Sequence, residues 1–102
     1  MNLREKRIEF TWCLSMLLRW AHEKHIDVAL GPDGLKHMAG SLHYVGLAVD
    51  LNAYRDGEYL TATEDYRELG ESWKALNPDN RWGGDFHNAD GNHFSMTHEG
   101  KA

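Results

Sequence analysis

The chain has 102 residues, a net charge of −5, a hydrophobic fraction of 41% and a single cysteine. This length holds one domain with one modest core, the apolar content excludes a disordered chain, and one cysteine excludes an internal disulfide. The acidic balance argues against nucleic-acid binding. The apolar run from Trp12 to Leu18 is too short for a membrane span and lacks a signal-peptide cleavage site. We therefore expect one monomeric domain over residues 1–102, synthesised as a soluble cytoplasmic protein without membrane insertion.

The N-terminal segment is predicted to form an amphipathic helix. A capping box of Asn2 and Glu5 marks its start, and apolar residues recur at helical spacing through Phe10, Cys13, Leu14, Leu17 and Ala21. A short strand is predicted from Ile26 to Leu30, before the turn signal Gly31-Pro32. Residues 31–41 are predicted to form a glycine-rich loop.

The centre of the chain alternates between apolar and polar residues from Val45 to Tyr54, which predicts a strand with one buried face. The face expected in the core carries Leu47, Val49, Leu51 and Ala53, and the opposite face carries Ala48, Asp50 and Asn52. Asp56-Gly57 then predicts a two-residue hairpin turn that returns through Glu58 to Leu60.

A second helix and a final strand are predicted in the rest of the chain. Thr61 and Glu64 match a capping box for this helix, which is expected to end at Asn77-Pro78. Its buried stripe consists of Tyr66, Leu69, Gly70, Trp73 and Leu76, and Trp82 is also read as core. After turns at Trp82-Gly83-Gly84 and Asp90-Gly91, His93 to Met96 forms the last strand. Helices flanking a small antiparallel sheet predict an α+β fold.

Three side chains far apart in the sequence are candidate metal ligands. Asp50 lies on the polar face of the central strand, where a carboxylate is costly unless it is paired or bound to a cation. Gly46 can fold His43 back toward it, and His93 supplies a third ligand. Imidazole nitrogens and a carboxylate oxygen suit Zn²⁺, and three protein ligands leave a fourth position for water.

Asp90, three residues before His93, is predicted to be the catalytic base. A carboxylate beside the water can accept its proton and pass it to the leaving amine. Asp85 is the rival candidate for this role. Phe94 is expected to give His93 a dry wall.

The string Ser-x-His-x-x-Gly-x-Ala-x-Asp, from Ser41 to Asp50, has a chance probability on the order of 10⁻⁵. It resembles the first motif of the zinc D,D-peptidases and L,D-endopeptidases (M15-like peptidases), which include VanY- and VanX-like carboxypeptidases and phage endolysins. The family's second motif is an acidic residue three before a final His that an aromatic residue follows. Asp90, His93 and Phe94 match it. The resemblance implies the same three zinc ligands and the same base.

The resemblance covers about residues 40–96, and the run from Trp82 to Phe86 is most similar to the phage L-alanyl-D-glutamate endopeptidases. It implies that the substrate is the stem peptide of peptidoglycan, cut between L-Ala and D-Glu. Because the sequence shows no signal peptide, such an enzyme is expected to act in the cell wall or periplasm after a partner has permeabilised the membrane. The family's upstream arginine has no counterpart between Arg19 and Arg55, and Lys36 or His37 is the candidate substitute.

Five side chains are predicted to face the substrate: Lys36, His37, Ser41, Asp85 and His87. For Ser41, the alternative is that it only shapes the turn. Two other functions stay open. One is a D-Ala-D-Ala carboxypeptidase. The other is a non-catalytic module that binds the cell wall and keeps zinc only as a structural staple.

Overall fold

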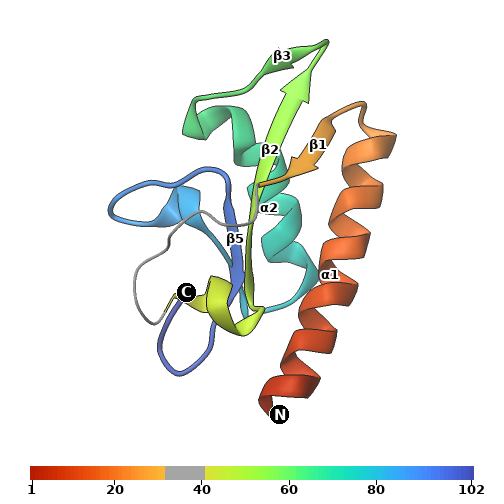
Figure 1. Cartoon of the computed structure of the whole chain (residues 1–102). Coiled ribbons are helices and arrows are strands. Elements are labelled where there is room, and N and C mark those ends of the chain that lie inside the picture. The colour runs from red at the N-terminus through yellow and green to blue at the C-terminus, as the bar shows by residue number, and fades with distance from the viewer. Residues whose placement is uncertain (32–40) are drawn as a thin grey trace.

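The computed structural model describes residues 1–31 and 41–102. Lys36 and His37 lie outside the described residues, so their substrate contacts stay predictions. The elements in chain order are α1 (Leu3–Glu23), β1 (Asp27–Leu30), the 3₁₀ helix η1 (Leu42–Val45), β2 (Ala48–Arg55), β3 (Glu58–Tyr59), η2 (Thr63–Tyr66), α2 (Arg67–Leu76), β4 (Asn80–Trp82), η3 (Gly83–Asp85) and β5 (His93–Met96). The α+β prediction is confirmed (Figure 1).

Helix α1 starts at the predicted capping box. The side chain of Asn2 accepts a hydrogen bond from the N–H of Glu5 at 2.8 Å, and the Glu5 carboxylate accepts one from the N–H of Asn2 at 3.0 Å. These bonds satisfy donors that the first turn of a helix leaves open. The buried face carries Phe10, Cys13, Leu17 and Ala21, as predicted. None of the helices within the described ranges is long and apolar enough to cross a membrane.

The strands form one antiparallel sheet in the order β1-β2-β5-β4, and β3 also pairs with β2. Strand β2 begins at Ala48 rather than at the predicted Val45. The difference arises because Gly46, with φ +75°, ends η1 just before the strand. Strand β4 is not predicted by the sequence pattern, because three residues are too few to show alternation.

The hairpin predicted at Asp56-Gly57 is confirmed. Arg55 pairs with Glu58 across the turn, and the two turn residues have φ values of +52° and +81°. Positive φ at both central residues is what a type I′ turn requires.

The predicted capping box of α2 is wrong, because the N-cap is Ala62 rather than Thr61 and the first helical turn, η2, begins at Thr63. There the N–H of Ala62 donates to the Asp65 carboxylate at 3.1 Å. Glu64 instead binds Arg67 through both carboxylate oxygens. The predicted stripe is nevertheless buried at Tyr66, Leu69, Gly70 and Trp73, and Leu76 is half-buried against the core.

The two helices α1 and α2 pack beside each other against the sheet (Figure 1). Trp73 lies at the centre of the core, where its ring meets the ring of Phe10 at 5.5 Å and that of Phe94 at 6.3 Å, both edge-on. Because side chains alternate along a strand, the neighbour of Phe94, His93, points to the opposite face. Asp50 lies on that face too, and this side of the sheet carries the candidate site.

Candidate metal centre

The turn before β2 positions His43. The hydroxyl of Ser41 caps η1 by accepting a hydrogen bond from the N–H of His43 at 3.2 Å. At the other end of η1, Gly46 takes a left-handed conformation that glycine adopts without a Cβ penalty. The chain therefore turns back into β2, and His43 lies close to the strand that follows it, as the sequence predicts.

Strand pairing brings Asp50 and His93 together. The two residues are opposite each other in the antiparallel pair of β2 and β5, which places their side chains on one face. The pairing is extended by the C=O of Asn92, which accepts a hydrogen bond from the N–H of Leu51 at 2.8 Å. His93 is buried, and Asp50 is half-buried.

The side chains of His43, Asp50 and His93 converge on one point. Nε2 of His43 lies 3.4 Å from Oδ1 of Asp50 and 3.3 Å from Nδ1 of His93. Nδ1 of His93 lies 3.9 Å from Oδ1 of Asp50. In the part of the chain that the structure describes, these three residues form the one group of His, Cys, Asp and Glu side chains compact enough to hold a metal ion.

The spacing of these donor atoms fits zinc. Atoms that bind zinc tetrahedrally at about 2.0–2.2 Å lie about 3.3–3.6 Å from one another. Two of the three separations agree with this spacing, and the third is slightly longer. Two imidazoles and one carboxylate also match the three-ligand sets of catalytic zinc sites, which keep a fourth position open.

An aromatic ring packs against the buried candidate ligand His93, but it is not the predicted ring. The ring of Phe86 lies 5.4 Å from that of His93. Phe94, which is expected to fill this role, is fully buried on the other side of the sheet against Trp73. Adjacent residues of a strand point to opposite faces, so Phe94 cannot line the site of its neighbour.

Asp90 lies in the turn that leads into β5. Its N–H donates to the C=O of Gly83 at 2.9 Å, and its own C=O accepts from the N–H of His93 at 3.1 Å. A Cβ at Gly83 would collide with the C=O of Asp90, so this close approach requires glycine. Asp90 is exposed and lies outside the ligand group. The Asp90 carboxylate is therefore accessible to water and is not one of the candidate metal ligands.

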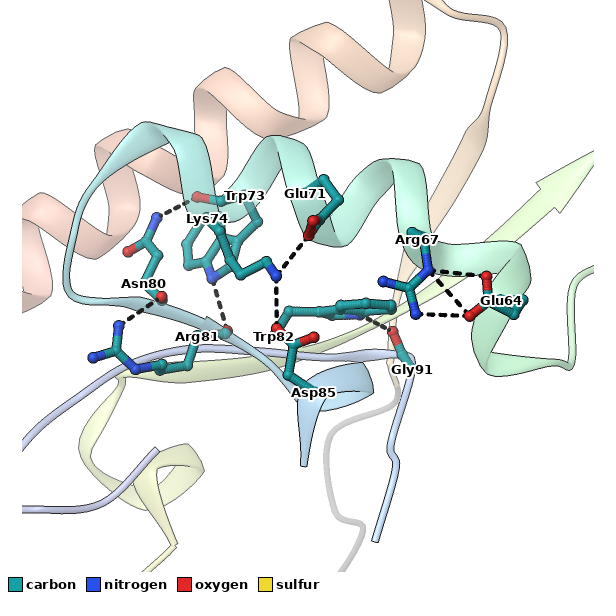
Figure 2. Close-up of polar contacts among 10 residues, drawn as sticks. All are labelled: Glu64, Arg67, Glu71, Trp73, Lys74, Asn80, Arg81, Trp82, Asp85 and Gly91. Atoms are coloured by element: carbon teal, nitrogen blue, oxygen red, sulfur yellow. Dashed lines mark hydrogen bonds and ion pairs between the residues drawn. The ribbon is translucent and has the colours of Figure 1, made fainter. Parts of the chain in front are cut away.

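Trp82 also binds the turn that contains Asp90 (Figure 2). Its indole N–H donates to the C=O of Gly91 at 2.7 Å, and its side chain is fully buried. Gly70 and Gly84 both lie against the indole ring, where a Cβ would collide with it. Trp82 therefore fixes the backbone next to Asp90, which is a role beyond the core position predicted for it.

Helix α2 places two cations over the indole ring of Trp82 (Figure 2). Cζ of Arg67 lies 5.2 Å and Nζ of Lys74 lies 5.9 Å from the ring centroid. At such distances the face of an aromatic ring attracts a cation. Lys74 also binds Asp85 at 2.7 Å and Glu71 at 2.6 Å. The hydrogen bond to Asp85 and, to a smaller extent, the one to Glu71 raise the pKa of Lys74. The Asp85 carboxylate is therefore engaged in an ion pair with α2.

With Asp90 as the base that the sequence predicts, the substitution Trp82→Phe should lower kcat about tenfold without changing the zinc content. It removes the hydrogen bond to Gly91 but keeps a ring between the glycines, so the turn with Asp90 loses its anchor. Trp73→Phe is the matched control, because that buried indole donates to Arg81 and Ser95 instead. Steady-state kinetics and thermal unfolding of both variants test this. Equal losses of kcat in the two variants would show that only general destabilisation is measured.

The remaining predicted site residues are placed as follows. Ser41 accepts a hydrogen bond from the N–H of His43 and so shapes the turn, and its contact with substrate stays a prediction. Asp85 and His87 are exposed in the segment between β4 and β5. Their contacts with substrate stay predictions.

Sequence reasoning misses the roles of Phe86 and Trp82. Trp82 ends the three-residue strand β4, and Phe86 lies in the turns that follow, so no periodicity connects either side chain to its neighbours in space. The available signal is the pair of glycines after Trp82, which indicates that another group closely approaches the backbone there.

Comparisons with known proteins agree with this geometry. A family model described as D-alanyl-D-alanine carboxypeptidase matches residues 36–96, a range that contains the three candidate ligands and Asp90. The fold is similar to the crystal structure of the Serratia marcescens L-Ala D-Glu endopeptidase ChiX, with a TM-score of 0.63 and 22% sequence identity over 92% of this chain and 85% of that one. No curated protein is significantly similar to the chain.

Proposed function

Because the match over residues 36–96 shows that this chain belongs to the D-alanyl-D-alanine carboxypeptidase family of M15 peptidases, we propose that it is a zinc-dependent hydrolase of peptidoglycan stem peptides that cuts between L-Ala and D-Glu. The observation that carries this proposal is the convergence of His43, Asp50 and His93 with the donor spacing of a zinc site. The enzyme would act in the cell wall or periplasm after the membrane has been permeabilised.

In the proposed mechanism, the metal is bound by His43, Asp50 and His93, and Asp90 transfers the proton. Zinc, when bound, supplies a Lewis acid that lowers the pKa of water to about 7 and polarises a peptide carbonyl. The Asp90 carboxylate accepts the proton of the attacking water and delivers it to the nitrogen of the leaving D-Glu residue. Gly83, Trp82 and the N–H of His93 hold the backbone of Asp90 in place for both transfers.

Two observations favour an endopeptidase. The acidic residue of the second motif is Asp90, in a sequence context similar to that of the phage endopeptidases. The fold is also similar to that of an L-Ala D-Glu endopeptidase. The match to a family described as D-alanyl-D-alanine carboxypeptidase favours the second candidate, a carboxypeptidase that releases terminal D-Ala.

Digestion of purified peptidoglycan distinguishes these two functions. We expect a new amino terminus on D-Glu, detected by dansylation and mass spectrometry of the soluble fragments, with no increase in free D-Ala. A chelator should abolish the reaction, and added zinc should restore it. Release of D-Ala without new D-Glu termini would assign the carboxypeptidase instead. A protein that binds the wall and releases neither product would be the non-catalytic module.

A further inference from the structure

A polar pocket of ≈ 230 Å³ lies beside the proposed base. One wall comes from β3, the segment that follows it and η2, and is lined by Tyr59, Thr61, Thr63 and Tyr66. The hydroxyl of Tyr66 is bound to the backbone of Ala53 and Leu60. The other wall is the turn before β5, including Asp90 and Asn92. The two walls touch at Gly91, where a Cβ would lie 2.9 Å from Cα of Thr63. The pocket therefore borders the backbone of the turn that positions Asp90.

Hydrogen-bonded residues of the sheet link the lining of the pocket to the metal centre. Asn92 lines the pocket and directly precedes the ligand His93, and its Nδ2 donates to Oδ1 of Asn52 at 3.3 Å. Asn52 follows Asp50 by two residues on β2, so both side chains lie on one face. The hydroxyl of Tyr59 donates to the same Asn52 oxygen at 3.4 Å. A peptide bound at the metal centre can therefore extend a side group into this pocket.

The charges around the pocket favour a neutral or N–H-bearing group over an anion. Among the described lining residues, Asp90 is the one that carries a carboxylate. Arg67, which follows Tyr66, is already bound by Glu64, with Nε at 2.9 Å and Nη2 at 2.7 Å from its oxygens. This hydrogen bonding lowers the pKa of Glu64, so the pair stays ionised and its charges cancel. Asp90 would repel an anion in the pocket. Arg67 would not offset this repulsion, because Glu64 already binds it.

We infer that this pocket is a substrate subsite that accepts an uncharged carboxamide and discriminates against a carboxylate. The inference rests on the proposed function, because the D-glutamyl residue of a stem peptide carries a carboxyl group outside the scissile bond that is either free or amidated. The carboxamide N–H groups donate to Asp90, and its oxygen accepts from Thr61 and Thr63. A carboxylate at the same place lacks donors for Asp90 and repels it.

The test compares two synthetic stem peptides that differ only in this group, carboxamide or carboxylate. We expect kcat/KM for the amide to exceed that for the acid about tenfold. The double variant Thr61→Val with Thr63→Val should lower kcat/KM for the amide about three- to tenfold, through KM rather than kcat, and change that for the acid less than twofold. Thr11→Val, an exposed threonine on α1, is the matched control and should change neither.

The possible outcomes separate this inference from the function beneath it. Equal cleavage of both peptides, faster cleavage of the acid, or an equal loss for both peptides in the double variant would overturn the subsite and leave the endopeptidase intact. A wild-type protein that cuts neither peptide in the presence of zinc would overturn both.

Discussion

Replacing Asp90 with asparagine should reduce kcat about 10³-fold, with the zinc content and the melting temperature unchanged. Asparagine keeps the shape of the side chain and the backbone bonds to Gly83 and His93, but it cannot accept the proton of the attacking water. Positioned general bases contribute about 10²–10⁴-fold in rate. Timed digestion of a defined stem peptide measures kcat, and metal analysis and thermal unfolding of the same protein sample measure the other two quantities.

Asp85→Asn is the comparison that makes this prediction specific. Asp85 is near in sequence and also acidic, but its carboxylate binds Lys74 on the surface. Breaking such an exposed pair costs roughly 0–1 kcal/mol of stability, and a loss of the substrate contact predicted for Asp85 would raise KM, so we expect a small effect on kcat. If Asp85→Asn removed activity and Asp90→Asn did not, the base would be Asp85.

Replacing His43 with alanine should remove both activity and the stabilisation of the fold by zinc. His43 contributes the Nε2 atom that lies within 3.4 Å of both other donors, and its loss leaves two ligands from β2 and β5. In the wild type, zinc at about one hundred times its Kd should stabilise the fold by about 2.7 kcal/mol, which raises the melting temperature of a domain of this size by roughly 10–20 °C. Thermal unfolding with and without chelator measures this shift.

The control for this experiment is His22→Ala. His22 is exposed in the last turn of α1, far along the chain from the metal centre, and its loss should leave the zinc-dependent shift intact. A His43→Ala protein that still melted at a higher temperature with zinc than with chelator would show that the ion binds elsewhere.

The parts of the fold that follow from local sequence patterns are predicted well. Asn2 and Glu5 start α1, Asp56-Gly57 makes the hairpin, and alternation identifies the polar face of β2 that carries Asp50. These features depend on backbone geometry over a few residues. The approach of His43 to Asp50 also follows from the sequence, because Gly46 reverses the chain just before β2. His93 joins these two candidate ligands through the pairing of β2 with β5.

The parts that depend on long-range packing are not predicted. Strand β4 exists because it pairs with β5, and its three residues carry no pattern of their own. Phe86 reaches His93, and Trp82 reaches Gly91, across a segment without periodicity. The capping box expected at Thr61 fails because the acidic residue that binds the start of the turn is Asp65. Because Asp65 directly follows Glu64, the acidic residue that closes the capping box lies one position further along the chain than predicted.

The central claim is that two imidazoles and one carboxylate bind a catalytic zinc ion, and metal analysis of the purified wild-type protein tests it most directly. We predict about one zinc per chain, retained on dialysis and lost with chelator together with the activity. Full activity in a sample that contains no divalent metal would contradict this account.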